Sequence, residues 1–436
     1  MNICIQTLGC KVNQYETQAL ETIFTERGHV ICTQEDPCDA YIINTCAVTA
    51  ESGRKSRQAI RHAKKQHPGA LIAVCGCFSQ IEPEQIRDLG TDLISGSGGR
   101  VEFADALEQL WSDHQSRDLV DDPRRRHTFE PLPAGSLSAR TRAMLKIQDG
   151  CSNFCSYCII PYARGPVRSL PIEKAAEEAA RLNAEGYKEM VITGIEISSY
   201  GRDFGDGTSL IDVITAISEK TPDMRLRLGS LEPRTATDAF CRKLAALPNI
   251  CGHFHLSMQS GCDATLARMH RKYTSAEFLE SVTNLRRYFP ECGITTGMIT
   301  GFPGETEAEF NCSLEFIQKC AYSAMHIFPY SPRPGTPAAE MPEQVEKRVK
   351  HQRARQAAEI ADRMEQIYLD SCVGKTLFVL FEQETGGLST GHAENYCHVA
   401  VEKTGIRNKI LPVLVTKSGH STLFGEIADK AFDSAD

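Results

Sequence analysis

Residues 143–158, AMLKIQDGCSNFCSYC, decide the fold and contain the first candidate site. The apolar run AMLKIQ is typical of a buried β-strand. It leads directly into three cysteines with the spacing CxxxCxxC, at Cys151, Cys155 and Cys158. A closed zinc site uses four ligands at close spacing, and no further cysteine follows before Cys241. Three thiolates therefore predict a metal site with one open position, and the alternatives are a zinc ion completed from a distance or three buried cysteines.

The alternation of strand and helix continues from this stretch to about residue 328. The next candidate strands are EMVITG, RLRLGS, HFHLSM, GITTGMITG and AMHIFPY, separated by helices such as IEKAAEEAARLNAEG and SAEFLESVTNLRRYF. Six repeats of strand and helix predict a full or partial (β/α) barrel. Because barrel chemistry lies at the carboxyl ends of the strands, the three cysteines fall on the functional face.

Residues 1–112 show the same alternation and predict βαβ units around a parallel sheet. Cys10, Cys46 and Cys77 each end or closely follow an apolar run, so each falls at the carboxyl end of a predicted strand. Ligands of open α/β sheets bind at that edge, and three separate strands can bring these thiols together. Small residues that fill strand ends are the alternative. Cys75 competes with Cys77 because it lies two residues earlier on the same face of a regular strand.

The remaining segments complete an α/β chain of three parts. Residues 113–140 are rich in proline and charge, and we interpret them as a linker. The barrel part spans residues 141–369 and ends in a charged helix. Residues 370–436 contain the short runs TLFVLFE, STGHAENYCHVAVE, LPVLVTK and STLFGEIA, which are typical of a small β-barrel.

The composition excludes several classes of protein. With 41% hydrophobic and 24% charged residues, the chain has no low-complexity character. No apolar run approaches the ~18 residues of a membrane span, and the first residues are typical of a strand rather than a secretion signal. We therefore expect a cytoplasmic protein with no membrane partner. In that compartment 18 cysteines indicate metal ligation or burial rather than disulfides, and the net charge of −8 argues against a uniformly basic surface for nucleic acid.

A local basic patch is nevertheless predicted on the helix that follows Cys46. Arg54, Arg57, Arg61 and Lys65 recur at spacings of three and four residues, which places them on one helix face. Phosphate contacts supply much of the affinity for RNA, so this face is the candidate RNA contact. An ordinary solvated helix surface is the alternative.

The CxxxCxxC motif after the first barrel strand resembles that of the radical S-adenosylmethionine (SAM) enzymes. The resemblance implies a [4Fe-4S] cluster on the three thiolates, with SAM bound to the iron that has no protein ligand. The family match implies SAM contacts at Tyr157, Glu196, Ser230, Glu232 and Gln259. Strand-end turns are the alternative for the residues at the strand ends.

Over its whole length the chain resembles the methylthiotransferase family. The segments that carry the resemblance are TLGCKVNQYET, NTCAVTAESGRKSRQAIRHA, KIQDGCSNFCSYCIIPYARGPVRS, MQSGCDATLARMHRKYT, GFPGET and FPYSPRPGT. They are similar to the branch that acts on N6-threonylcarbamoyladenosine in tRNA, while sister branches act on isopentenyladenosine in tRNA or on a ribosomal protein. The resemblance implies a flavodoxin-like N-terminal domain with a second [4Fe-4S] cluster on Cys10, Cys46 and Cys77, and a C-terminal TRAM domain that grips RNA.

The implied activity is addition of a methylthio group to C2 of the adenine at tRNA position 37. One SAM donates a methyl group to sulfur, and another is cleaved to the radical that removes hydrogen from C2. The implied partners are the tRNA anticodon stem-loop and an electron donor of unknown identity. An Fe-S protein that binds RNA without radical chemistry is the alternative from another class.

Two residues depart from the family pattern. Gly297 stands where the family usually has aspartate, and Leu170 where arginine is common. We expect the first to weaken barrel packing or a SAM contact, and the second to remove an RNA contact.

Overall fold

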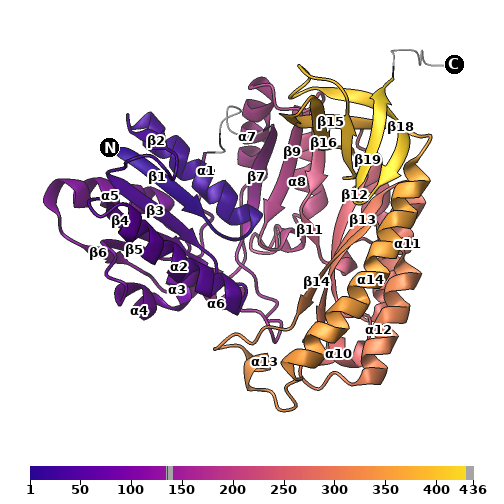
Figure 1. The fold of residues 1–436 in the computed structure, drawn as a ribbon, viewed down its shortest axis with the longest axis horizontal. Coiled ribbons are helices and arrows are strands. Elements are labelled where there is room, and N and C mark those ends of the chain that lie inside the picture. The colour runs from indigo at the N-terminus through magenta and orange to yellow at the C-terminus, as the bar shows by residue number, and fades with distance from the viewer. Residues whose placement is uncertain (134, 136–140, 429–436) are drawn as a thin grey trace.

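The first part of the chain is a six-stranded parallel sheet with helices around it (Figure 1). The computed structural model describes residues 1–133, 135 and 141–428. The strand order is β2-β1-β3-β4-β5-β6, which is the flavodoxin-like order with one strand added at the edge, so the expected class is confirmed. The elements are β1 (Asn2–Thr7), α1 (Lys11–Glu26), β2 (Val30–Cys32), β3 (Ala40–Thr45), α2 (Ala50–Gln66), β4 (Leu71–Gly76), α3 (Cys77–Ile81), α4 (Pro83–Arg87), β5 (Leu93–Ser95), α5 (Arg100–Asp113) and β6 (Arg117–Leu119).

The edge strand β6 lies in the stretch that the composition indicated as a linker. It pairs with β5, and farther along the same stretch Phe129 and Leu132 are buried against the core. A three-residue edge strand with two charged side chains has no periodicity to detect, so only backbone pairing reveals it. Residues 134 and 136–140, at the end of the expected linker, lie outside the described residues.

The central part is a partial barrel of six parallel strands, as the sequence predicts. The third barrel strand is interrupted at Gly229 into β10 and β11, so the strands form two sheets, β10-β9-β7-β8 and β11-β12-β13-β14. The short β8 is antiparallel to β7 and is an addition to the six parallel strands. The strands are β7 (Arg142–Asp149), β8 (Arg168–Ser169), β9 (Glu189–Gly194), β10 (Arg225–Leu228), β11 (Ser230–Leu231), β12 (His253–Gln259), β13 (Gly293–Thr300) and β14 (Ala324–Pro329). The helices are α6 (Ile160–Arg164), α7 (Ile172–Ala184), α8 (Leu210–Lys220), α9 (Asp238–Ala245), α10 (Asp263–Arg268), α11 (Ser275–Tyr288), α12 (Glu307–Cys320) and α13 (Pro337–Glu340).

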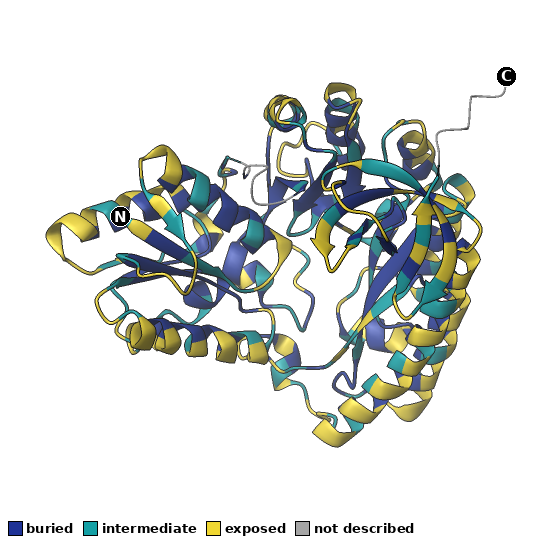
Figure 2. Cartoon of the chain, turned by 45° about the horizontal axis from the view of Figure 1, so that its top comes forward, coloured by how far each residue is buried: buried dark blue, intermediate teal, exposed yellow. Residues whose placement is uncertain are grey.

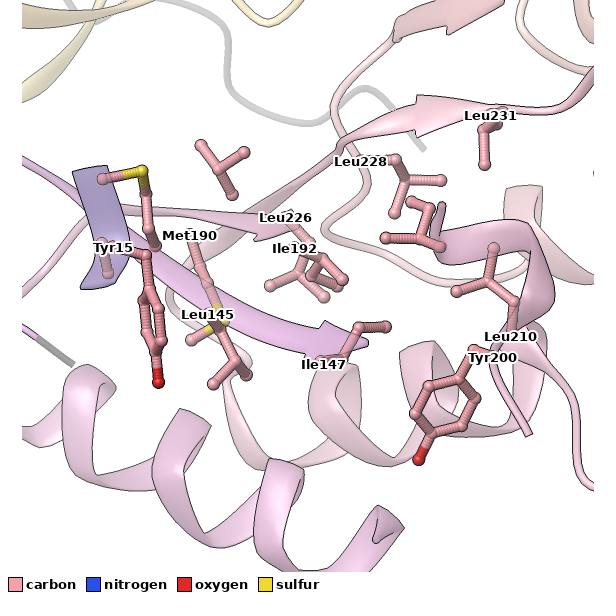
Figure 3. Packing of buried hydrophobic residues seen from close by; sticks show 14 of the residues in the cluster. Tyr15, Leu145, Ile147, Met190, Ile192, Tyr200, Leu210, Leu226, Leu228 and Leu231 are labelled. Atoms are coloured by element: carbon pink, nitrogen blue, oxygen red, sulfur yellow. The ribbon is translucent and has the colours of Figure 1, made fainter. Parts of the chain in front are cut away.

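One hydrophobic core joins the first sheet to the barrel. Tyr15 of α1 packs in the same cluster as Leu145 of β7 and Met190 of β9 (Figure 3). The Tyr15 hydroxyl also donates a hydrogen bond of 2.5 Å to the carbonyl of Leu132. Helix α1 is therefore held against the first strands of the barrel, which brings its N-terminal residues to the barrel edge.

The last part is a closed five-stranded β-barrel beyond a long helix. Helix α14 (Lys347–Cys372) packs along β14 and leads into β15 (Thr376–Thr385), β16 (Leu388–His392), β17 (His398–Val401), β18 (Ile410–Gly419) and β19 (Thr422–Ile427). The run STGHAENYCHVAVE forms two strands rather than one, because residues 393–397 make a turn in which Tyr396 has a φ of 72°. Residues 429–436 lie outside the described residues.

Two arginines lock this β-barrel to the central barrel. Arg225 and Arg227 both pair with the fully buried carboxylate of Glu189 on β9. Each also donates hydrogen bonds of 2.7 to 3.0 Å to backbone carbonyls of the β-barrel. Buried residues line the strands, and exposed residues mark the outer faces of the helices (Figure 2). No described helix has the length and apolar character needed to cross a membrane.

Candidate functional site

The three N-terminal cysteines meet at one edge of the first sheet. Strands β1, β3 and β4 are neighbours, and their carboxyl ends are followed by Cys10, Cys46 and Cys77, which we call the N-terminal triad. The order of the strands reverses between β1 and β3, which is where open α/β sheets bind their ligands. The expectation of three thiols at neighbouring strand ends is thus met, whereas Cys75 lies inside β4 within the core.

Two glycines allow the strand ends of the N-terminal triad to approach closely. Gly9 has a φ of 110°, and a Cβ on it would lie 2.8 Å from Cβ and 3.0 Å from Sγ of Cys46. Gly76 has a φ of 106°, and a Cβ there would lie 2.4 Å from the carbonyl oxygen of Thr45. Only glycine fits this backbone and this spacing. The residue before Cys10 and the residue before Cys77 therefore both pack against the end of β3.

The thiols of the N-terminal triad influence one another electrostatically. Burial raises the pKa of each thiol. The pKa is raised further at Cys10 by Cys46, at Cys46 by Cys77, and at Cys77 by Cys10. Thiols of this kind keep their protons until a metal centre displaces them.

The barrel cysteines lie on a loop directly after β7. The barrel triad consists of Cys151, Cys155 and Cys158. Burial raises the pKa of the Cys151 and Cys158 thiols, and the neighbouring Cys155 raises both further. The loop is tied down by backbone hydrogen bonds, including Cys151 N–H to the Gly165 carbonyl at 3.0 Å and Ser156 N–H to the Met269 carbonyl at 3.1 Å. The motif is therefore held in a fixed loop at the carboxyl ends of the barrel strands.

A buried carboxylate without a full set of partners lies beside the barrel triad. Glu196 follows β9, and its charge raises the pKa of the Cys151 thiol. One oxygen, Oε2, accepts a hydrogen bond from the Ser199 hydroxyl, while Oε1 is buried and has no hydrogen-bond partner among the described residues. An unsatisfied buried carboxylate oxygen is costly, so an ammonium group in this place would stabilise it. Glu196 thus fits the amino group of SAM.

Each triad has an arginine that donates to one of its sulfurs, and the sequence analysis missed both. Arg164 of α6 donates from Nε to Sγ of Cys77 at 3.3 Å, and Arg271 donates from an Nη to Sγ of Cys155, also at 3.3 Å. Arg271 also pairs with Glu232 at 2.7 Å, so Glu232 positions this arginine, and its expected SAM contact stays a prediction. Hydrogen bonds to ligating sulfurs tune the potential of Fe-S clusters. Spacing alone could not reveal either arginine, because each reaches its sulfur across the tertiary fold.

A buried ionic network joins the surroundings of the two triads. Glu16 of α1 pairs with Arg100, Lys146 and Arg164, all of them at most 1% exposed. Asp149, two residues before Cys151, pairs with Lys146 and Arg164 as well. The network therefore spans from the first sheet to the first barrel strand, and Arg164 connects it to Cys77.

The spacing of the triads does not suit a single ion. Among the described residues, no group of three or more His, Cys, Asp or Glu side chains could hold one metal ion. A four-iron cluster binds each thiolate through a different iron, so its ligands lie farther apart than those of one zinc ion. Two sets of three converging thiols with arginine at a sulfur are thus compatible with clusters.

The comparisons with known proteins agree with this geometry. Residues 145–317 match the Radical SAM superfamily, and residues 2–96 match Uncharacterized protein family UPF0004. The threonylcarbamoyladenosine tRNA methylthiotransferase MtaB of Bacillus subtilis is 36% identical over 426 residues, which cover 96% of this chain and 94% of that protein. The chain belongs to the radical SAM methylthiotransferase family.

Other members of the methylthiotransferase family and one fold relative extend the comparison. MtaB of Thermotoga maritima is 37% identical over 90% of this chain and 89% of its own length. The tRNA-2-methylthio-N(6)-dimethylallyladenosine synthase of Acetivibrio thermocellus is 32% identical over 87% and 80%. Among solved structures, the radical S-adenosylmethionine methyltransferase TsrM from Kitasatospora setae has a TM-score of 0.57 at 15% identity and covers 89% of this chain and 81% of that chain. That likeness concerns the fold alone.

The other SAM residues expected for this methylthiotransferase lie in different surroundings. Tyr157 packs its ring against Phe302, with the ring centroids 6.4 Å apart. Gln259 ends β12 with a φ of 66°, a strained conformation that is common at functional sites. Ser230 is exposed and lines a cavity with His255, which lies near the start of its strand. The structure therefore places Ser230 away from the carboxyl ends of the barrel strands, where the barrel triad lies. Its SAM contact stays a prediction.

The expected RNA face is one side of α2. Arg54, Arg61 and Lys65 are exposed, while Arg57 is half-buried with its guanidinium 5.5 Å from the centroid of the Phe78 ring. The helix begins four residues after Cys46, and Thr49 caps its first turn. The basic side chains are thus presented to solvent on a helix that starts beside the N-terminal triad.

The two departures from the family pattern have different consequences. Leu170 is 5% exposed and packs in the main core, so the leucine side chain itself is not presented to RNA, and the expected loss of an RNA contact stays a prediction. A Cβ on Gly297 would make only ordinary contacts of 3.8 Å with His326 and Phe328. Glycine at 297 therefore leaves space in the barrel where the family usually has a larger side chain.

Proposed function

We propose that this methylthiotransferase adds a methylthio group to C2 of N6-threonylcarbamoyladenosine at position 37 of tRNA. The proposal rests above all on the second cysteine triad: a radical SAM barrel alone generates a radical, whereas a further set of thiols at the edge of an attached sheet supplies a place for sulfur. The relatives with the highest identity among those compared carry the name threonylcarbamoyladenosine tRNA methylthiotransferase. A tRNA substrate supports a cytoplasmic location for the enzyme.

The cofactors are SAM and a [4Fe-4S] cluster on the barrel triad, together with a second cluster that we propose for the N-terminal triad. When bound, they supply the electron, the radical that removes hydrogen from C2 and the methylthio group. Glu196 binds the amino group of SAM through its unpaired oxygen. Arg271 and Arg164 hold the cysteine loops in place and donate to their sulfurs. An electron donor, whose identity the chain leaves open, is the remaining partner.

The proposed place of the RNA is the exposed face of α2. Its arginines and lysine can bind phosphates of the anticodon stem-loop, which would bring the base close to the N-terminal triad. We interpret the closed five-stranded C-terminal β-barrel as the TRAM domain that the family resemblance implies, and we propose it as a second RNA contact. We also propose the boundaries 1–112, 113–140, 141–369 and 370–436 for the domains and their linker, with β6 added to the first domain.

The decisive experiment is mass spectrometry of tRNA nucleosides from a strain that lacks this protein. We expect 2-methylthio-N6-threonylcarbamoyladenosine to disappear and its precursor without the methylthio group to accumulate. Loss of the methylthio group from isopentenyladenosine, or from a ribosomal protein, would instead assign the enzyme to a sister branch. Purified protein with both clusters should also form 5′-deoxyadenosine from SAM under reducing anaerobic conditions, and its failure to do so would leave only an RNA-binding Fe-S protein.

A further inference from the structure

Lys11 lies where all three parts of the protein meet. It is the first residue of α1 and directly follows Cys10 of the N-terminal triad. Its exposed side chain lines two cavities of about 990 and 420 Å³. The larger cavity is bounded by β7, β9 and the C-terminal β-barrel. The smaller cavity is bounded mainly by the amino-terminal parts of β12, β13 and β14 and by the C-terminal β-barrel. Cavities of this size accommodate small ligands such as a nucleoside.

Among the residues that the structure describes, Tyr396 is the only other one that lines both cavities. Its φ of 72° is strained for a residue with a side chain, and its ring is stacked between His253 and His392 at centroid distances of 4.5 and 4.7 Å. Both faces of the ring are therefore covered, so Tyr396 acts as a fixed wall rather than as a platform for a base. This wall and Lys11 therefore share the lining of both cavities.

The ammonium group of Lys11 has no anionic partner in these cavities. Within residues 1–133, 135 and 141–428, no ion pair or side-chain hydrogen bond is formed by Lys11, which lines both cavities. Most of the carboxylates nearby are already engaged: Glu189 pairs with three arginines, and Glu382 pairs with Arg142 and His392. Glu365, which also lines the smaller cavity, forms no ion pair with Lys11. Glu384 accepts a hydrogen bond of 2.9 Å from the Ile406 N–H. A cation that faces a cavity among occupied carboxylates is suited to an anionic ligand.

We propose that Lys11 binds the carboxylate of the threonylcarbamoyl group and so selects this substrate. This inference rests on the proposed function. The reacting carbon must come close to the N-terminal triad, and the Cα of Lys11 lies about 3.8 Å along the chain from that of Cys10. The substituent on N6 of the same adenine ring then extends past the triad toward the Lys11 cavities. The apolar dimethylallyl group of isopentenyladenosine would leave Lys11 without a partner, which disfavours that base as a substrate.

The test compares two tRNA substrates in the holoenzyme. One carries N6-threonylcarbamoyladenosine, and the other carries the same base with its threonyl carboxylate converted to the methyl ester. For the native enzyme we expect kcat/KM for methylthio transfer to fall roughly 10- to 100-fold on the ester, the range for loss of a hydrogen bond between charged groups. For Lys11→Met, kcat/KM on the carboxylate substrate should be about as low as that of the native enzyme on the ester. The kcat/KM values of this variant for the two substrates should differ by less than about threefold.

Two further variants sharpen the test. Lys11→Arg keeps the charge and should restore most of the preference for the carboxylate. Lys220→Met, at the end of α8 and outside both cavities, should behave as the native enzyme. The inference is overturned if Lys11→Met keeps the full preference for the carboxylate, or if it loses iron, which would assign Lys11 to the cluster. If the native enzyme fails on the carboxylate substrate while it acts on isopentenyladenosine, the proposed function falls, and the inference falls with it.

Discussion

Replacement of Glu16 by glutamine should destabilise the protein strongly. Glu16 is 1% exposed and forms ion pairs with Arg100, Lys146 and Arg164. Glutamine has nearly the same shape but no charge, so the substitution leaves three buried cations facing a neutral amide. Asp149 can still compensate Lys146 and Arg164, but Arg100 has no ion pair with Asp149.

The size of the effect follows from this burial. Removal of one partner from a buried ion pair costs about 3–5 kcal/mol, because the remaining charge is left without compensation. Since the free energy of unfolding of a protein is only about 5–15 kcal/mol, the substitution would remove a large share of it. Because the network joins α1 to β7, we also expect the contact between the first sheet and the barrel to loosen.

Urea denaturation of the cluster-free chain, followed by far-ultraviolet circular dichroism at pH 7, measures the change in unfolding free energy. The matched control is Glu51→Gln, which breaks an ion pair with Arg54 whose two side chains are more than half exposed. That variant should unfold as the native chain does. A loss below about 1 kcal/mol for Glu16→Gln would refute the reasoning, because it would mean that the buried cations need no carboxylate.

The same carboxylate predicts a dependence of stability on pH. Burial would raise the pKa of Glu16, but Arg164, Arg100 and Lys146 outweigh it and lower the pKa from 4.5 to about 2. A carboxyl whose pKa is lower in the folded state stabilises the fold above its unfolded pKa and loses this contribution as pH falls. Native stability should therefore decline from about pH 4.5 toward pH 2, and Glu16→Gln should show a shallower decline in that window.

Three further outcomes are expected. Replacement of all three cysteines of the N-terminal triad by alanine should lower the iron content from about eight to about four atoms per chain. The variant should still cleave SAM but should no longer transfer a methylthio group. Methylthio transfer by this variant would show that the triad has another role. Arg164→Met removes the hydrogen bond to Cys77, so a redox titration followed by electron paramagnetic resonance should give a more negative potential for the second cluster, and an unchanged potential would exclude the contact. The double variant Arg57→Gln and Arg61→Gln should weaken tRNA binding and reduce the slope of log affinity against log salt by about 1 to 2, whereas an unchanged slope would leave α2 as a solvated surface.

The sequence predicted the parts of the fold that rest on periodicity. The six barrel strands and the parallel first sheet were found because their apolar runs recur between amphipathic helices. β6 was missed, because a short edge strand is held by backbone pairing with β5 rather than by its side chains. The burial of Leu170 was not foreseen for a related reason, since it depends on packing that a motif comparison does not contain.

By itself, the sequence singled out six cysteines as candidate metal ligands, three spaced along one loop and three at strand ends. Only the tertiary structure decided what surrounds them. Arg164 and Arg271 reach sulfurs that lie 87 and 116 residues away in the chain, and Lys11 faces cavities formed by all three parts. Spacing along the chain encodes a loop or the face of a helix, because neighbouring residues fix that geometry. Charge compensation in a buried site depends on contacts between distant segments, and only the folded chain brings those together.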